Sequence, residues 1–304
     1  MAPQIMISNH PIFQKFKGFA GEAAAGCDRD FIGSSIRQDF WGGQPRASAI
    51  RVEVPNPAFD EEYFEWIDVL ESVAEAGGSY TMIELGAGYG RWAVRAALAV
   101  QQQRQIPFKL IAVEAEPVHF EWLHAHFRAN GIDPNWHTLI QAAVSNSSGT
   151  AAFYVGSPQG NDTPDLWYGQ TLATGSETFD RVERQTHAGF EVRRNKGGWK
   201  SIQVPKISMR SLVRDLDRID LIDLDVQGEE LTAIESAIGD LDRNTKRLHI
   251  GTHGQEIEAG LRRVLSRHGW QCLADYGCGG SRDTPYGVIS FGDGVQSWLN
   301  PRLA

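Results

Sequence analysis

The stretch TMIELGAGYGRW at residues 81–92 constrains the fold of this chain more than any other stretch. Its apolar residues predict a buried strand, its glycines predict a tight turn, and a helix is expected to begin near Arg91. Because glycine lacks a Cβ atom, the backbone at Gly86, Gly88 and Gly90 can turn sharply and approach a ligand closely. The first N–H groups of the following helix have no partners within the helix and would face that ligand. The stretch therefore predicts a nucleotide-type cofactor at the edge of an α/β sheet.

The spacing of the glycines distinguishes between two classes of cofactor. The dinucleotide fingerprint is G-x-G-x-x-G/A after a strand, but here the third glycine comes one residue early and Glu84 precedes the turn. The pattern E-x-G-x-G-x-G instead resembles motif I of the class I S-adenosylmethionine-dependent methyltransferases. In that resemblance Gly86, Ala87, Gly88 and Gly90 contact the cofactor, and Glu84 binds its methionine ammonium directly or through water. A glycine turn without a ligand is the alternative, which the flanking strand and helix disfavour.

The second predicted strand, at 109–113, runs directly into two acidic residues, Glu114 and Glu116. One carboxylate can accept hydrogen bonds from both hydroxyls of a ribose. We favour Glu114 for this role because it follows the strand immediately, which also brings Ala115 beside the cofactor. The alternative is that both acids are ordinary solvated side chains.

The third predicted strand, at 138–144, ends in the small residues Ala142 and Ala143. Small side chains at the end of a strand leave room for a flat ring, so these two alanines are expected to lie against the adenine.

The rest of the chain predicts alternating helices and strands. Further helices are expected at 59–76, 91–103, 118–130, 208–216 and 256–268 and from Glu229 onward, and further strands at 202–207, 219–224, 247–251, 270–275 and 287–291. The last two strands have no helix between them, which indicates an antiparallel hairpin. This pattern matches an α/β fold of the Rossmann-like class I methyltransferase type, with a seven-stranded, mostly parallel sheet.

Two regions fall outside that pattern and set the domain organisation. Residues 1–58 form an N-terminal extension whose aromatic residues, such as Phe31, Phe40 and Trp41, either pack on the main domain or form a lid. The methyltransferase domain then spans 59–304, with an insertion at about 156–200, before strand four. The insertion carries Trp167, Tyr168, Phe179 and Trp199, and a long loop of this kind is usually functional or disordered. We expect it to shape the acceptor side, although a surface excursion is the alternative.

Candidate catalytic residues follow the fourth and fifth strands. Asp225 and His253 come at strand ends, where open α/β sheets place their chemistry. A hydroxyl is a weak nucleophile until its proton is removed, so we expect His253 to act as general base and Asp225 to orient it or to bind the acceptor and cofactor. The alternatives are a histidine that caps the next helix and an aspartate that shapes the turn.

A metal is not part of this main prediction, but Mg²⁺ is the alternative. The residues that offer suitable ligands are Asp223, Asp225, Glu229, Glu230 and His253. Alternation along a strand puts Asp223 and Asp225 on one face, whereas Glu229 and Glu230 are also explained as acids at the start of a helix.

Four stretches resemble the FkbM family of S-adenosylmethionine-dependent methyltransferases. They are IELGAGYG at 83–90, IAVEAEPVHFEWL at 111–123, QAAVSNSSGTAAFYV at 141–155 and DLIDLDVQGEE at 220–230. The resemblance implies O-methylation of hydroxyls on sugars, polyketides and related small molecules, in secondary-metabolite or glycan tailoring. Two positions depart from the family: Gln227 stands where glutamate is common, and Gly251-Thr252-His253 replaces I-E-x-H. The insertion at 156–200 and residues 1–58 match no generic element of the family, so the acceptor does not carry over from the resemblance.

Composition limits the other classes of function. The net charge of −9 disfavours a general nucleic-acid binder, and no apolar run approaches the length of a membrane span. Three cysteines without C-x-x-C spacing favour the reducing cytoplasm over a disulfide framework. The expected partner is a small-molecule or glycan acceptor, and a homo-oligomer is compatible with the sequence. An NAD(P)-dependent oxidoreductase and a catalytically silent scaffold are the alternatives, against which the glycine spacing and the retained acids argue.

Overall fold

The computed structural model describes residues 9–158, 168–173, 175 and 177–304 of the 304-residue chain. Trp167, which we expected to contribute to the insertion, lies outside these residues. None of the helices in the described ranges is both long and apolar enough to cross a membrane.

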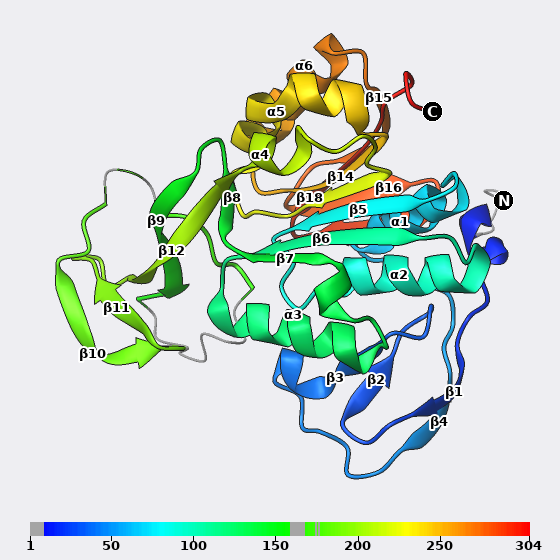
Figure 1. The fold of residues 1–304 in the computed structure, drawn as a ribbon, viewed down its shortest axis with the longest axis horizontal. Helices are drawn as coiled ribbons and strands as arrows, with labels where there is room; N and C mark the ends of the chain where they lie inside the picture. The colour runs from blue at the N-terminus through cyan, green and yellow to red at the C-terminus, as the bar shows by residue number, and fades with distance from the viewer. Residues whose placement is uncertain (1–8, 159–167, 174, 176) are drawn as a thin grey trace, which may run out of the picture.

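The centre of the fold is a seven-stranded sheet with the order β15-β18-β14-β13-β5-β6-β7 (Figure 1). Its strands are β5 (Tyr80–Leu85), β6 (Phe108–Glu114), β7 (Thr138–Gln141), β13 (Leu221–Leu224), β14 (Arg247–Thr252), β15 (Gln271–Tyr276) and β18 (Gly294–Leu299). β18 is antiparallel to both of its neighbours, and the other pairs are parallel. The predicted fold class is confirmed.

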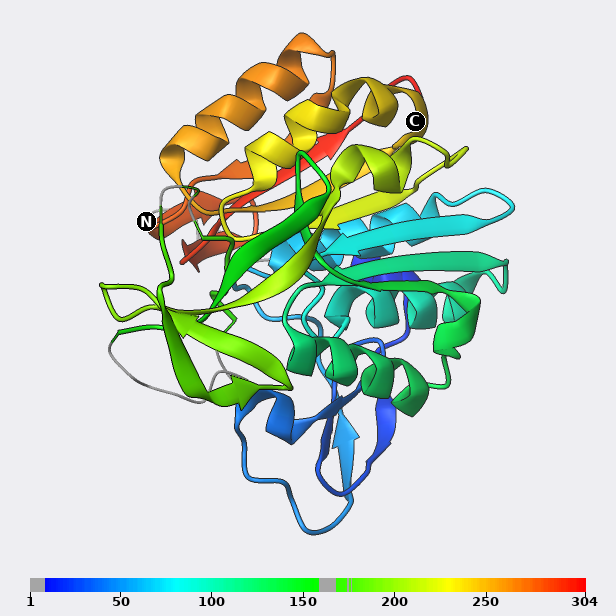
Figure 2. The same ribbon diagram turned by 60° about the vertical axis from the view of Figure 1, so that its left-hand side comes forward.

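Helices cover both faces of this sheet. One face packs against α1 (Tyr63–Ala74), α2 (Arg91–Gln103) and α3 (Pro117–Ala129), and the other against α4 (Met209–Val213), α5 (Glu230–Asn244) and α6 (Gln255–Arg267). Figure 2 shows α5 and α6 above the sheet and α3 below it. Alternation along β5 explains the two cores, because Met82 faces α1 and α2 while Ile83 and Leu85 face the opposite helices.

The predicted terminal hairpin was wrong in its second strand. Residues 287–291 form β17 (Gly287–Phe291), which pairs with β16 (Gly280–Thr284) in a separate hairpin, and the partner of β15 is β18. The sequence pattern missed β18 because its buried positions include two polar residues, Gln296 and Ser297. Both are hydrogen-bonded, the first to the Glu258 carbonyl and the second to the Asp68 carboxylate, so their burial is satisfied.

A second sheet extends from the end of β7. It contains β8 (Ala143–Ser145), β9 (Gly149–Gly156), β10 (Arg181–His187), β11 (Phe190–Arg194) and β12 (Lys200–Ser208), and β12 pairs with β8, β9 and β11. The strand expected at 138–144 is therefore broken at Ala142, whose N–H donates to the Glu114 carbonyl at 3.0 Å. This break carries the chain from the central sheet into the second sheet.

Most of the N-terminal extension lies beneath α3, while its residues 11–15 pack against α1 (Figure 1). It contains η1 (Pro11–Lys15), β1 (Ala20–Ala23), β2 (Cys27–Arg29), β3 (Ser35–Arg37), η2 (Gln38–Trp41) and β4 (Ile50–Glu53), and a short η3 (Pro134–Trp136) follows α3. Phe31 and Phe40 are buried, so the packing alternative holds for these two side chains, whereas Trp41 is 51% exposed.

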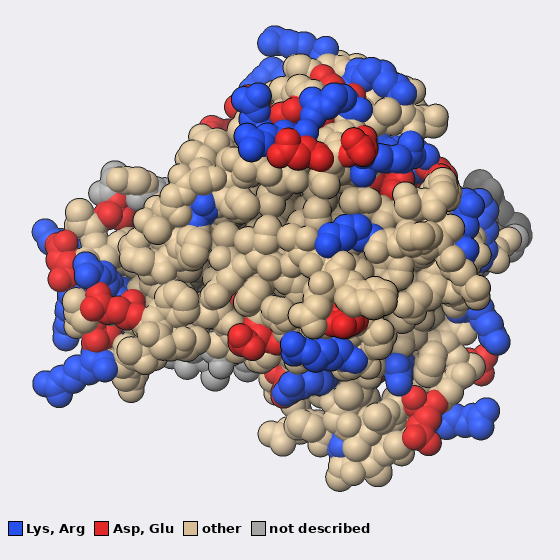
Figure 3. Space-filling model, in the orientation of Figure 1, with Lys and Arg blue, Asp and Glu red and all other residues tan. Residues whose placement is uncertain are grey.

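The charged side chains lie mainly at the periphery of the face shown in Figure 3. Lysines and arginines are interspersed with acids over α4 to α6 and over β10 and β11, and the surface between these regions is largely uncharged.

Candidate functional site

The glycine turn lies between β5 and α2, under the end of β13. Gly86 and Gly88 have φ values of +79° and +54°, and the N–H groups of Gly86 and Ala87 both donate to the Val113 carbonyl at 3.0 Å. A Cβ atom on Gly86 would lie 1.7 Å from the Asp225 carbonyl oxygen. Only glycine fits at this position, because the backbone of the turn passes directly against the end of the neighbouring strand. Gly90 serves packing instead, since a Cβ there would lie 2.3 Å from Leu123 Cδ1.

Glu84 connects the strand to the helix that follows the turn. Its two carboxylate oxygens accept from the N–H groups of Trp92 at 3.0 Å and Ala93 at 2.9 Å. Burial, together with the nearby Asp223, raises the pKa of Glu84 to about 8. Its side chain lines the cleft described below, so an ammonium group could reach lone pairs that the two backbone donors leave free.

Glu114 is placed where the sequence predicted a ribose carboxylate. Its oxygens accept from Gly88 N–H at 2.6 Å and from Glu116 N–H at 2.7 Å, and burial raises its pKa. Glu116 is engaged elsewhere, since it accepts from His119 N–H at 2.6 Å at the start of α3 and contacts His187. Glu114, and not Glu116, lines the cavity beside the glycine turn.

A first cavity of about 630 Å³ lies at the carboxyl edge of the sheet. It is lined by seven of the residues predicted for the cofactor: Gly86, Gly88, Glu114, Ala115, Ala142, Ala143 and Asp225. Other residues also line the cavity, among them His119, Phe153, Tyr168, Gln170 and Leu172, and of these five the sequence had pointed only to Tyr168, as part of the insertion. The last four come from β9 and the insertion, so only the tertiary fold brings them to the site.

Tyr168 closes this cavity against the N-terminal extension. Its ring stacks on His119 with 4.5 Å between centroids, and its hydroxyl donates to the Phe40 carbonyl at 2.8 Å. It also packs on Trp41, with 4.8 Å between centroids. The insertion and the extension, which are far apart in the sequence, therefore meet over the glycine turn.

A second, wider cleft of about 1440 Å³ adjoins the first cavity and shares Gly86, Gly88, Tyr168, Asp225 and Gln227 with it. Ala87 also lines this cleft. Its acidic residues are Glu61, Glu62, Glu65, Glu84, Asp223, Asp225 and Asp293. Arg91 is also present but is paired with Glu62. Burial raises the pKa of Glu65 and of Glu84, so the cleft owes its preference for positive charge to its remaining carboxylates.

Asp225 and His253 lie side by side, as their positions at strand ends suggested. The Asp225 side chain is 49% exposed and lines both cavities, whereas His253 is mostly buried, with Nε2 3.4 Å from Asp225 and 3.6 Å from Asp293. Its Nδ1 lies 2.8 Å from Glu230. Burial lowers the pKa of His253, but these three carboxylates outweigh it and raise the pKa to about 10. A histidine that is already protonated cannot accept a proton, so this environment argues against the expected general-base role.

The five residues considered for Mg²⁺ do not form one group. Glu229 accepts from Ser145 Oγ at 2.7 Å, while Asp225, Glu230 and His253 lie together. Asp223 instead lies beside Glu65 and His249.

Comparisons with known proteins found a family and a relative by sequence. The family described as the methyltransferase FkbM domain matches residues 84–271. A protein of Jannaschia sp. (strain CCS1) that is provisionally named a methyltransferase is 25% identical over 264 residues, 86% of this chain and 88% of that protein.

Solved structures of low identity were also found. Methyltransferase FkbM from Methylobacillus flagellatus KT has a TM-score of 0.43 at 12% identity, over 80% of this chain and 55% of that chain. Precorrin-6y C5,15-methyltransferase from Geobacter metallireducens GS-15 has a TM-score of 0.38 at 13% identity, over 77% and 85%.

The strand order, with its one antiparallel strand, and the glycine turn at the carboxyl edge define a methyltransferase of the Rossmann-like class I type. The family match covers more than half of the chain, and the chain therefore belongs to the methyltransferase FkbM domain family. Membership implies a cofactor of the S-adenosylmethionine type.

Proposed function

We propose that this protein transfers a methyl group from S-adenosylmethionine to a hydroxyl of a small molecule or glycan. The observation that carries the proposal is the first cavity, where Gly86 and Gly88 of the turn lie beside the buried Glu114 carboxylate, which accepts from Gly88 N–H. Such a turn leaves room for close backbone approach by a nucleoside, and a buried carboxylate in the same cavity suits its ribose.

The residues present fit this cofactor. Glu114 would accept from the ribose hydroxyls, the small side chains of Ala115, Ala142 and Ala143 would flank the adenine, and the acidic second cleft would favour the methionine ammonium. When bound, the cofactor supplies an electrophilic methyl group on a sulfonium.

We assign binding of the acceptor to the second cleft, because this cleft adjoins the first cavity and is open to solvent. Asp225 faces both spaces, so its carboxylate is placed to accept a hydrogen bond from an acceptor hydroxyl. His253, held as an imidazolium, would act as a positioning residue that fixes Asp225. Trp41, Tyr89 and Tyr168 give the same cleft apolar surface for the body of an acceptor.

The test is isothermal titration with S-adenosylmethionine and S-adenosylhomocysteine. We expect micromolar affinity in the wild type and at least a tenfold loss in Glu114→Ala, because the ribose hydroxyls lose their acceptor. Glu121→Ala is the matched control, since Glu121 is an exposed acid on α3 and its loss should leave affinity unchanged. A wild-type protein that binds NAD(H) and neither of these two compounds would overturn the proposal.

A further inference from the structure

A row of polar residues crosses the middle of the central sheet. Glu84 on β5, Asp223 on β13, His249 on β14 and Ser297 on β18 are register partners across three neighbouring strand pairs. Their exposed fractions are only 2 to 3%. The corresponding positions of a parallel sheet are usually apolar, because both faces are covered. Buried polar groups are costly unless they are paired, so this row needs a compensating interaction.

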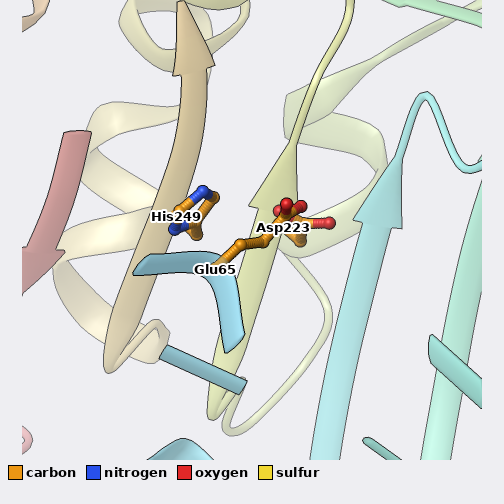
Figure 4. Close-up of side chains that lie close together, drawn as sticks. All are labelled: Glu65, Asp223 and His249. Atoms are coloured by element: carbon orange, nitrogen blue, oxygen red, sulfur yellow. The ribbon is translucent and has the colours of Figure 1, made fainter. Parts of the chain in front are cut away.

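Glu65 of α1 reaches the centre of this row. One ligand atom from each of Glu65, Asp223 and His249 lies within 4.8 Å of the others. Figure 4 shows the three side chains, from one helix and two strands, coming together in one place. Two carboxyl groups and an imidazole at this separation can hold a cation between them.

Hydrogen bonds within the described part of the chain leave one atom of this group without a partner. Asp223 Oδ1 is buried and accepts no hydrogen bond, although Asp223 is only 3% exposed. An unpaired carboxylate oxygen at this depth is unfavourable unless a cation or a shared proton compensates it. Besides the cluster itself, this atom is a second observation that points to a cation or to a proton shared with Glu65.

His249 is oriented by a second carboxylate. Its Nδ1 lies 2.8 Å from Asp68 Oδ2, so the Nε2 atom is the one left to serve as a ligand. Asp68 is itself fixed by Arg247 at 2.9 Å and by the Ser297 hydroxyl. Metal-binding imidazoles are commonly held in this way, with the second ring nitrogen on a carboxylate that sets the tautomer.

The group is accessible from the second cleft. Glu65, Asp223 and His249 all line it, so an ion could enter and keep open positions facing the cleft. One nitrogen and two oxygen ligands suit Zn²⁺, Mn²⁺ or Co²⁺ better than Mg²⁺ or Ca²⁺, which prefer oxygen alone. In the Asp225, Glu230 and His253 group, by contrast, Glu230 already accepts from the N–H groups of Val226 and Gly228.

We propose that Glu65, Asp223 and His249 form a binding site for one divalent first-row transition-metal ion, with Asp68 orienting the imidazole. The ion would sit in the wall of the second cleft. This assignment does not depend on the acceptor or on methyl transfer.

The test uses chelator-treated full-length protein, without S-adenosylmethionine, titrated with Co²⁺ and Zn²⁺. We expect one equivalent of Co²⁺ to give a ligand-field absorption spectrum and one equivalent of Zn²⁺ to displace it. Affinity should fall at least tenfold in Asp223→Asn and His249→Gln, and by about 10- to 100-fold in Asp68→Asn. If Asp223→Asn or His249→Gln does not fold, Glu65→Gln replaces a ligand on the helix instead, and its metal affinity should fall in the same way.

His253→Gln is the matched control, because it alters the neighbouring acid–histidine group and should leave Co²⁺ binding unchanged. Two results would overturn the assignment: a wild-type protein that takes up neither ion, which would mean that the two carboxyls share a proton, or binding lost in His253→Gln and retained in Asp223→Asn.

Discussion

The protonation state of His253 is decided by its three carboxylate neighbours, Asp225, Glu230 and Asp293. Because its folded-state pKa is raised to about 10 from the ordinary value of 6.5, the imidazolium form persists through neutral pH and is lost only as the pH rises through about 10. A positively charged His253 lies 3.4 Å from Asp225, so under the proposed function Asp225, and not His253, would be the base nearest to an acceptor hydroxyl.

We therefore predict that His253 titrates well above pH 6.5 in nuclear magnetic resonance spectra, with the signal assigned through His253→Gln. Removing one charge in Asp225→Asn should lower its pKa by about one unit, since an opposite charge within about 4–6 Å favours the charged form. A His253 pKa at or below 6.5 in the wild type would contradict this and would restore the general-base role.

Short local sequence patterns predicted the positions of some residues of the candidate site. These patterns predicted the positions of Glu84, the glycines of the turn and Glu114, because each of them lies in or directly after a predicted strand. Glu65 and Asp293 could not be found in the same way. They reach the cleft from α1 and from the turn before β18, and only tertiary packing brings them beside Asp223 and His253.

His126 connects the N-terminal extension to α3. Its Nδ1 lies 3.1 Å from the Tyr89 carbonyl and its Nε2 lies 3.1 Å from Ser34 Oγ, so the neutral ring, protonated at Nδ1, donates to the first and accepts from the second. Burial, reinforced by Arg95 and Arg91, lowers the pKa of His126 to about 4.

The contact that buried His126 makes with Ser34 predicts that the stability of the protein falls at acidic pH. Between pH 6.5 and about 4 the unfolded chain binds a proton at His126 that the folded chain does not, so its contribution to stability is complete above pH 6.5 and is lost as the pH falls. From pH 7 to pH 5, urea unfolding should show a decrease of about 1–2 kcal/mol that His126→Asn lacks. Equal pH dependence in the two proteins would contradict the prediction.

The residue ranges of the helices could be predicted from the sequence better than those of the strands. The helix expected at 91–103 coincides with α2, because a glycine turn precedes it and one of its faces is uniformly apolar. β18 was missed because its buried Gln296 and Ser297 bond to a helix carbonyl and to a helix carboxylate, which breaks the apolar pattern. Likewise, a single expected strand became β7 and β8, since a bend at Ala142 depends on which sheet each half joins.

The N-terminal extension and the insertion, which are far apart in the chain, contact each other at the second cleft through Trp41 and Tyr168. Trp41 is half-exposed and covers Arg91, whose Cζ lies 4.5 Å from the ring centroid. Neither segment could be placed from the sequence, because their positions depend on contacts with each other rather than on local periodicity.

The substitution Trp41→Ala should therefore weaken binding of the acceptor more than it destabilises the fold. We expect the KM of an acceptor identified by screening hydroxyl compounds to rise about tenfold, with the affinity for S-adenosylmethionine and the unfolding midpoint nearly unchanged. Trp136→Ala is the control, because Trp136 is 79% exposed on η3. Equal acceptor KM values in the two variants would show that the extension does not bound the acceptor site.

β18 is the last strand of the central sheet to be synthesised. It lies between β14 and β15, although both precede it in the chain, and in the described sheet β15 is hydrogen-bonded to β18 alone. On the ribosome, β15 therefore emerges with no strand to join, and the edge of β14 stays open until residues 294–299 have left the exit tunnel. A nascent chain halted before them, for example by a premature stop codon, would leave β15 unpaired and the edge of β14 open to other chains, and would be prone to aggregate.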